Sequence, residues 1–192
     1  MNKLIVIEGI DGAGTTTQCS RLASHFGLYM TREPSDRPIG KLLRAILRHE
    51  IAVEDEKAVA LLFAADRLDH VHAEIEPALA DKSVITDRYV MSSIVYQSLA
   101  VERGFVADIN RFARPPDLTV LVDVDVDVAE SRRAQRGGVE ERYDRRATQE
   151  RLAAAYRTEA QHHGAIIVDG NGDADAVFAA LAPLVQSCLA RP

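Results

Sequence analysis

The stretch from Gly9 to Thr17 combines residue types at a spacing that suits phosphate binding. It follows a largely apolar run at 3–8 and leads into a helical pattern. Glycines let backbone N–H groups converge on an anion, and a helix N-terminus adds partial positive charge. The spacing is that of G-x-x-x-x-G-K-[ST], in which Thr16 supplies the hydroxyl that binds Mg²⁺. We predict phosphate contacts from Gly9, Ile10, Asp11, Gly12, Ala13, Gly14, Thr15, Thr16 and Thr17.

One position departs from this pattern, because Thr15 occupies the place of the lysine. That lysine normally reaches the β- and γ-phosphates, so a full positive charge is missing from the loop. The alternative is a Gly-rich strand-to-helix turn that binds no ligand. We favour the phosphate loop because it lies where a doubly wound sheet would place one.

The rest of the chain alternates strands and helices, and this order determines where such a loop lies. Apolar runs predict strands at Leu28–Thr31, Ser83–Thr86, Leu118–Val122 and Ile166–Val168. Helical patterns cover 38–49, 55–80, 92–102 (closed by Gly104), 129–135, 148–162 and 173–189. The alternation predicts a single α/β domain over 1–192, with three α/β/α layers and a parallel, five-stranded central sheet. Ligands then bind outside the carboxyl ends of the strands.

The composition excludes several classes of protein. Of the 192 residues, 47% are hydrophobic and 27% are charged, which fits a folded chain and not a disordered one. The net charge of −6 argues against a nucleic-acid partner, and no apolar run is long enough to span a membrane. Cys19 and Cys188 form no disulfide or metal pattern, so a cytoplasmic location is expected.

Two predicted helices each present a polar face that suits a nucleobase. Phe63 and Arg67 are four residues apart, so a ring and a planar donor share one face. Ser93, Tyr96 and Gln97 share another, and Gln97 offers both a donor and an acceptor. The alternatives are a core phenylalanine with a surface arginine, and an ordinary polar helix face.

Several charged residues are candidates for binding phosphate or Mg²⁺. Arg44 and Arg88 are candidates for a monophosphate clamp, because guanidinium matches phosphate oxygens in pairs. Asp87 ends a buried strand and is a candidate ligand for Mg²⁺. The alternative for Asp87 and Arg88 is a structural ion pair. The Arg-rich segment at about 131–145 carries two glycines, which favours a short lid over ordinary solvated surface.

Taken in order, these motifs resemble the thymidylate kinases, which have the P-loop NTPase fold and phosphorylate dTMP with ATP. The resemblance covers nearly the whole chain and lies in the loop from Glu8 to Gly14 and in five further segments. These are Thr31-Arg-Glu-Pro34, Ile39-Gly40 through Arg44, Leu62-Phe-Ala-Ala-Asp-Arg67, Thr86-Asp-Arg-Tyr89 through Gln97, and Arg114-Pro-Pro-Asp-Leu-Thr119. The last segment carries one proline more than the pattern of the family. Singly each motif is weak, but together they are specific.

The resemblance implies roles for individual residues. It places Ser93 and Gln97 at thymine, Tyr96 beside the 2′ position of the sugar and Asp11 near the acceptor 3′-hydroxyl. Glu33 supports the acceptor site. The P-loop contains no arginine, so the family arrangement with lid arginines applies. Arg132, Arg136 and Arg142 then contact ATP, and Asp11, Asp87, Arg88 and Arg136 serve catalysis. Family membership also implies Mg²⁺, ATP as co-substrate and a homodimer.

Two rivals stay open at this stage. One is a kinase for another nucleoside monophosphate, since the residues that favour thymine and deoxyribose are few. The other is a nucleotide-binding protein that has lost catalysis together with the loop lysine. Because Thr16, Asp87, Arg88 and the lid segment are retained, we favour an active enzyme.

Overall fold

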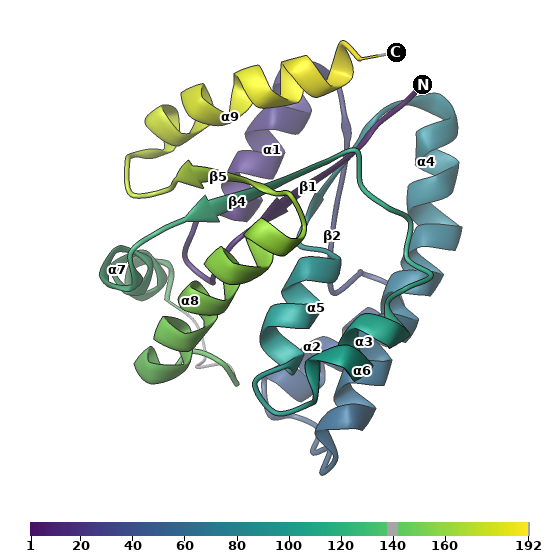
Figure 1. The fold of residues 1–192 in the computed structure, drawn as a ribbon, viewed down its shortest axis with the longest axis vertical. Helices are drawn as coiled ribbons and strands as arrows, with labels where there is room; N and C mark the ends of the chain where they lie inside the picture. The colour runs from purple at the N-terminus through teal and green to yellow at the C-terminus, as the bar shows by residue number, and fades with distance from the viewer. Residues whose placement is uncertain (138–141, 192) are drawn as a thin grey trace.

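The computed structural model describes residues 1–137 and 142–191, and its centre is a five-stranded parallel sheet (Figure 1). The strands are β1 (Leu4–Glu8), β2 (Tyr29–Arg32), β3 (Val84–Asp87), β4 (Leu118–Asp123) and β5 (Ile166–Asp169). Their order in the sheet is β2-β3-β1-β4-β5. The predicted three-layer fold and its parallel, five-stranded sheet are therefore confirmed.

Helices cover both faces of the sheet because the central strands are apolar on both sides. One face packs against α1 (Thr15–Phe26) and α9 (Ala174–Leu189), and α8 (Arg146–His162) lies across the other (Figure 1). Successive side chains of β1 belong to two different apolar clusters. Ile5 and Ile7 belong to the cluster that contains Leu22 and Leu181, whereas Leu4 and Val6 pack with Ile75 and Leu79.

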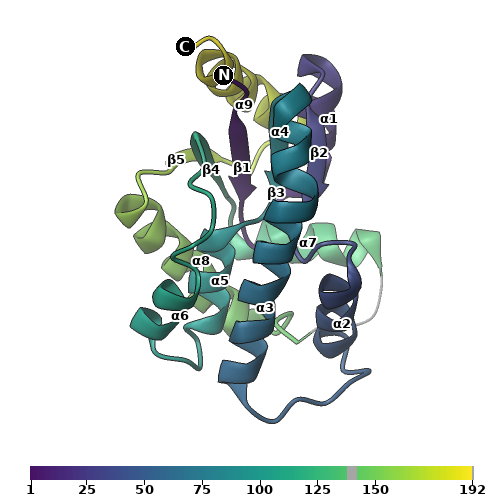
Figure 2. The same ribbon diagram turned by 90° about the vertical axis from the view of Figure 1, so that its right-hand side faces the viewer.

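A long helical rod runs beside the sheet (Figure 2). It comprises α3 (Glu56–His70), a π-helical turn (Val71–Ile75) and α4 (Glu76–Asp81). The predicted helix over 55–80 is thus present with one local change. Pro77 lies in the first turn of α4 and has no N–H to donate, and the wider π turn directly precedes that helix.

The predicted helix over 92–102 is wrong in its boundaries. The structure has α5 (Val90–Gln97) and a separate α6 (Arg103–Ile109), and Gly104 lies in the first turn of α6. The Glu102 carboxylate caps α6 by accepting hydrogen bonds from the backbone N–H groups of Gly104 and Phe105, at 2.8 and 3.0 Å. A capping acid therefore starts a helix where we expected one to end.

Two helices remain, α2 (Pro38–Leu47) and α7 (Val126–Arg136). The helix α7 leads into the predicted lid, of which residues 138–141 lie outside the described part of the chain. Within that part, no helix combines the length and the apolar character needed to cross a membrane.

Candidate active site

The Gly-rich loop between β1 and α1 has the backbone geometry of an anion-binding turn. Gly12 and Gly14 have φ values of 89° and 88°, which favour glycine. Gly14 caps α1 without a side-chain hydrogen bond, so the first N–H groups of the helix remain directed at the loop. At Gly12 a Cβ atom would lie 2.3 Å from the carbonyl oxygen of Ala129 in α7. A glycine is needed there because the loop packs directly on the backbone of α7.

A cavity of about 680 Å³, here called the loop cavity, opens in front of this loop. Its walls include Asp11, Gly12, Ala13, Gly14, Thr15, Thr16 and Thr17, together with Arg32, Arg132 and Arg136. Gly9 and Ile10, at the start of the loop, are not among the lining residues. Backbone N–H groups and guanidinium groups are the chemistry that binds a polyphosphate.

Thr16 and Asp87 meet at the edge of this cavity. The Thr16 hydroxyl donates a hydrogen bond to Asp87 Oδ2, and Asp87 Oδ1 is buried without a hydrogen-bond partner among the described residues. A hydroxyl next to a carboxylate with an unused oxygen suits Mg²⁺, which typically binds one or two protein oxygens and keeps several waters. No cluster of three or more His, Cys, Asp or Glu side chains that could hold a metal is found in the described residues.

A second cavity, of about 180 Å³, lies between α3 and α5 and is called the helix cavity below. Eight of the nine residues predicted to bind the acceptor line it. They are Asp11, Glu33, Phe63, Arg67, Arg88, Ser93, Tyr96 and Gln97. Asp11 lines both cavities, so the two sites meet at this residue.

The helix cavity contains polar side chains that could form hydrogen bonds with the donors and acceptors of a ligand. Gln97 is only 4% exposed, and neither atom of its amide makes a hydrogen bond of normal geometry to a described residue. A buried, unpaired amide is unfavourable unless a ligand satisfies it. Ser93 Oγ accepts a hydrogen bond from Arg67 Nη2 at 3.0 Å.

Arg67 is nearly fully buried, at 1% exposure, and is tied to several elements. Its Nε donates to Glu33 Oε2 at 2.9 Å and its Nη2 to the carbonyl oxygen of Tyr89 at 3.0 Å. Its Nη1 donates to the side-chain oxygen of Asn110. These hydrogen bonds within the protein therefore fix the guanidinium in position without any contact to a ligand.

Arg88 has a left-handed backbone, with φ at 70°, which is uncommon outside glycine and typical of functional sites. Its Nη1 donates to the carbonyl oxygen of Gly9 at 2.9 Å and to the hydroxyls of Tyr96 and Tyr156, both at 3.2 Å. Burial acts to lower the pKa of Arg88, but neighbouring groups, Tyr96 first, raise it well above its ordinary range. The guanidinium therefore stays charged in its buried position.

Glu8 fixes the start of α5, which carries Ser93, Tyr96 and Gln97. Its carboxylate is fully buried and accepts hydrogen bonds from the backbone N–H groups of Tyr89 at 2.9 Å and Ser92 at 3.2 Å. Burial raises the pKa of Glu8, and the Ser92 hydroxyl opposes this by donating to the carboxylate. An acid at the N-terminus of a helix is also favoured by the helix dipole.

Two of the predicted site arginines, Arg44 and Arg142, lie outside both cavities. Arg44 is not among the lining residues of either cavity, and its guanidinium donates to the carbonyl oxygens of Ser35 at 2.5 Å and Pro34 at 2.8 Å. Arg142 likewise lines neither cavity and forms an ion pair with Glu56 at the start of α3. In this structure Arg44 braces the loop after β2, and Arg142 joins the lid segment to α3.

Two other lid arginines contact the loop directly. Arg133 Nη1 donates to the backbone carbonyl of Asp11 at 2.6 Å, and Arg136 Nη2 donates to its carboxylate at 2.8 Å. Burial acts to raise the pKa of Asp11, but the hydrogen bond from Arg136 and the charge of Arg88 outweigh it and lower the pKa. Arg132 donates to the carbonyl oxygens of Gly170 and Gly172, at 3.0 and 2.7 Å.

The chain matches the family model described as thymidylate kinase over residues 7–180. The chain belongs to the thymidylate kinase family. The reaction of this family is transfer of a phosphoryl group from ATP to dTMP, which yields ADP and dTDP. The chain is accordingly an ATP-dependent nucleoside monophosphate kinase, and the rival interpretations from the sequence are not favoured.

Individual relatives agree with this assignment. A probable thymidylate kinase from Pyrobaculum aerophilum is 40% identical over 185 residues, which is 95% of each chain. One from Methanococcus aeolicus is 44% identical over 73% of this chain and 70% of its own. Among solved structures, thymidylate kinase from Candida albicans superposes with a TM-score of 0.81 at 25% identity, covering 97% of this chain and 92% of that one.

Three residues that line the two cavities were not among the site residues predicted from the sequence. Arg32 reaches the loop cavity from the end of β2, and Tyr143 and Gln149 line the helix cavity. Arg32 lies inside the Thr31–Pro34 motif and Tyr143 inside the Arg-rich segment, so both belong to stretches that the sequence analysis singled out. Gln149 is fully buried in the first turns of α8, where no motif singles it out.

Proposed function

We propose that ATP binds in the loop cavity and dTMP in the helix cavity, so that phosphoryl transfer occurs where the two meet. The observation that carries this proposal is the position of Asp11, which lines both cavities. Transfer between phosphates depends on alignment of the attacking oxygen with the γ-phosphate and on neutralisation of charge. Asp11 and Arg88 lie at that junction.

On the ATP side, the loop N–H groups hold the phosphates. Thr16 and Asp87 would hold Mg²⁺, which would neutralise negative charge on the phosphates when it is bound. The unpartnered Oδ1 of Asp87 supports this role. Arg132 and Arg136 supply positive charge at the cavity wall, and Arg142 remains a predicted ATP contact that would require the lid segment to shift.

On the dTMP side, the thymine ring lies against Phe63 with its polar edge toward Arg67, Ser93 and Gln97. The Gln97 amide makes no hydrogen bond of normal geometry to a described residue, and this supports the arrangement, because one side chain can pair with both an N–H and a carbonyl of a pyrimidine. Tyr96 excludes a 2′-hydroxyl. Arg88, with Arg44 after a side-chain movement, binds the monophosphate.

The wider assignments are part of the same proposal. The chain is one kinase domain over 1–192 with a lid at about 131–145, acts as a homodimer in the cytoplasm and needs no nucleic-acid or membrane partner. The family resemblance and the composition support these assignments.

A coupled assay of ADP release tests the proposal. With ATP and Mg²⁺ present, kcat/KM for dTMP should far exceed the values for dCMP, dGMP and AMP. Gln97→Leu should reduce kcat/KM for dTMP and narrow this preference, whereas Gln161→Leu on the exposed end of α8 serves as the control. Equal turnover of dCMP and dTMP would contradict the base assignment. A wild-type protein with no turnover of any monophosphate would instead be a binding protein.

A further inference from the structure

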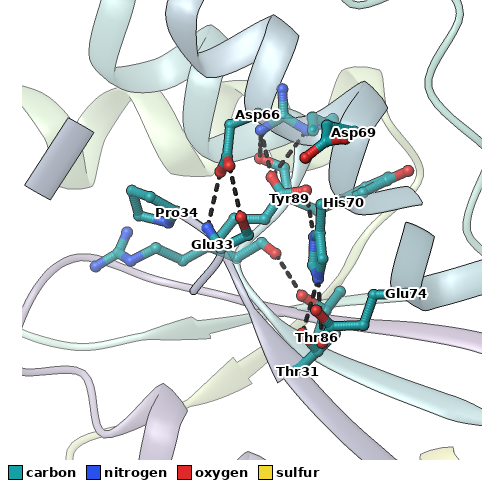
Figure 3. A network of polar contacts seen from close by, with 12 residues as sticks. Thr31, Glu33, Pro34, Asp66, Asp69, His70, Glu74, Thr86 and Tyr89 are labelled. Atoms are coloured by element: carbon teal, nitrogen blue, oxygen red, sulfur yellow. Dashed lines mark hydrogen bonds and ion pairs between the residues drawn. The ribbon is translucent and has the colours of Figure 1, made fainter. Parts of the chain in front are cut away.

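His70, at the end of α3, is fully buried and enclosed by acidic side chains from other elements (Figure 3). Its Nδ1 lies 3.3 Å from Glu33 Oε1, in the segment after β2. Its Nε2 lies 2.7 Å from the Thr31 hydroxyl and 3.6 Å from Glu74 Oε1. A neutral ring carries only one N–H, so an oxygen at each nitrogen requires either a second ring proton or a hydroxyl that donates to the unprotonated nitrogen.

The Thr31 hydroxyl decides where the protons lie. This oxygen is 2.5 Å from Glu74 Oε1, a carboxylate on a side chain that is 26% exposed and therefore reaches water. An ionised carboxylate only accepts hydrogen bonds, so the single hydroxyl proton of Thr31 points to Glu74. The Thr31 oxygen must then accept from His70 Nε2. Because Nδ1 faces another carboxylate, that nitrogen also has to carry a proton.

The same carboxylate of Glu33 serves the helix cavity from its other side. Its Oε2 accepts from Arg67 Nε at 2.9 Å, while its Oε1 faces His70. Glu33 and Arg67 line the helix cavity, whereas His70 is not among its lining residues. His70 therefore lies directly behind two residues that face the ligand and does not itself touch the site.

We propose that His70 is held as an imidazolium and is a positioning residue that fixes the Glu33 carboxylate, and through it the Arg67 guanidinium, for acceptor binding. This inference rests on the proposed function of the helix cavity. One positive charge on each side of Glu33 holds the carboxylate in a single orientation. A neutral ring would donate to only one of its two neighbours, so either Glu33 or Thr31 would lose a hydrogen bond.

The surrounding charges favour this state. The acidic groups that face His70 are Glu33 from the segment after β2, Glu74 from the π turn and Asp66 from its own helix. Arg67 is the neighbouring cation, and Asp66 also accepts hydrogen bonds from the Ser35 N–H and hydroxyl, at 2.7 and 2.6 Å. Burial acts to lower the pKa of His70, but the hydrogen bond and charge of Glu33, followed by Glu74 and Asp66, raise it above its ordinary value.

The sign of the pH dependence follows. A raised pKa means that His70 holds its charge to a higher pH than an ordinary histidine and loses it as the pH rises through the raised value. We therefore expect KM for dTMP to be constant around neutral pH and to rise in the alkaline range, whereas KM for ATP does not follow this transition.

Long-range ¹H–¹⁵N NMR of protein labelled in histidine reads the state of the ring directly, with His70→Gln used to assign the signal. The expected result at pH 7 is a proton on both nitrogens of His70. A ring with one unprotonated nitrogen at pH 7 would overturn the proposal, whatever the substrate of the enzyme. Because this measurement needs no turnover, it is independent of the assignment of dTMP.

Kinetics then test the positioning role. His70→Gln should raise KM for dTMP roughly tenfold or more, because a hydrogen bond to a charged group is worth at least that factor. KM for ATP should stay near its wild-type value, and the alkaline rise in KM for dTMP should disappear. His72→Gln, two residues away and exposed, is the matched control and should change none of these values.

Thr31→Val provides a second variant if His70→Gln does not fold. It removes the hydroxyl that accepts from Nε2, and the expected result is a fall in the pKa of His70 together with a lower pH for the rise in KM for dTMP. An unchanged titration of His70 in this variant, or an unchanged KM for dTMP in a folded His70→Gln protein, would overturn the proposal.

Discussion

The guanidinium of Arg136 and the carboxylate of Asp11 form a two-point ion pair, with Nη1–Oδ1 and Nη2–Oδ2 distances of 3.2 and 2.8 Å. This pair joins the C-terminal end of α7 to the phosphate loop. Because the backbone of the loop also packs on α7 at Gly12, the lid helix and the loop form one unit. Asp11 lines both cavities, so a displacement of Arg136 would be transmitted to the place where we propose that transfer occurs.

The first prediction concerns the pH dependence of this ion pair. A double-mutant cycle of Asp11→Asn and Arg136→Ala, followed by urea unfolding, should give a coupling free energy of about 0.2–1 kcal/mol at neutral pH, because Arg136 is largely exposed. The pKa of Asp11 is lowered from its ordinary value of 3.8. The stabilisation is therefore complete above pH 3.8 and is lost as the pH falls through the lower value of the folded state.

Salt provides the control for that cycle. Raising the ionic strength should reduce the coupling at neutral pH, since exposed charges are screened. A coupling that persists unchanged in strong acid would mean that packing, and not charge, links the two residues.

The second prediction concerns Mg²⁺. Removing either oxygen of the pair, with Thr16→Ala or Asp87→Asn, should raise the Mg²⁺ concentration needed for half-maximal activity by about tenfold or more. The reason is that the Thr16 hydroxyl contacts Asp87 Oδ2, while Asp87 Oδ1 is buried without a hydrogen-bond partner among the described residues. Titration of activity with Mg²⁺ at saturating ATP measures this. Thr158→Ala, on the exposed face of α8, should leave the titration unchanged.

The third prediction concerns stability. Arg67→Met should lower the free energy of unfolding by about 3–5 kcal/mol, because it leaves the buried Glu33 carboxylate without its main cation. The exposed pair Arg157–Asp123 is the matched control, and Arg157→Met should cost at most about 1 kcal/mol. Urea unfolding at pH 7 compares the two.

A double variant tests the reason given for the loss of stability in Arg67→Met. Adding Glu33→Gln to Arg67→Met should recover part of the loss, since it removes the unpaired charge. If the two arginine variants lose equal stability, the buried ion pair is not an important source of stability.

The fold was predictable because its signals are local. Apolar runs bounded by turns identified all the strands, and the alternation with helices required parallel pairing. The exception is the helix predicted over 92–102. The helical pattern after Ser92 continues smoothly, so only the capping geometry of Glu102 reveals the break before α6. That break matters for the site, because Asn110, which directly follows α6, holds Arg67.

The site was predictable to a smaller extent. Residues on one helix face, such as Phe63 and Arg67, point the same way whatever the tertiary structure, and the structure brings both to the helix cavity. Long side chains that reach to other segments behave differently. Arg44 and Arg142 take their partners, backbone carbonyls and Glu56, from segments that only the folded chain brings near. His70 was not predicted to matter for the site at all, since nothing in its sequence context marks it as buried among carboxylates.

The fourth prediction concerns the sugar. The Tyr96 ring packs edge-on against Tyr143, with centroids 5.1 Å apart, and its hydroxyl accepts from Arg88. These contacts hold the ring where we propose that it excludes a 2′-hydroxyl. Tyr96→Ala should reduce the preference for dTMP over UMP, measured as the ratio of kcat/KM values, by a factor that corresponds to roughly 1–3 kcal/mol. Tyr96→Phe keeps the ring and should retain the preference while it weakens the contact to Arg88. An unchanged ratio in Tyr96→Ala would exclude the ring from the sugar site.

The last prediction concerns Thr15, which can donate a hydroxyl hydrogen bond but supplies no charge. The β- and γ-phosphates still require neutralisation, because phosphoryl transfer depends on it. Arg132 and Arg136 stand four residues apart on α7 and both line the loop cavity. Arg132 is held by carbonyl oxygens of the segment after β5, whereas Arg136 pairs with Asp11 at the junction of the cavities.

From these contacts we expect catalysis to depend on the lid arginines more than in relatives that keep the lysine, and on Arg136 most. Arg136→Ala should lower kcat on the order of 10³-fold, the factor that a charge-supplying arginine contributes in other phosphoryl-transfer sites. Thr15→Lys in that background should restore part of the rate, because the lysine returns a charge to the β/γ position. Single-turnover measurements on the wild type, both single variants and the double variant separate chemistry from product release. Arg151→Ala, exposed on α8, is the control. If every lid variant keeps kcat within a few-fold of the wild type, the lid does not compensate for Thr15, and Arg32, the other cation at the cavity wall, becomes the residue to change.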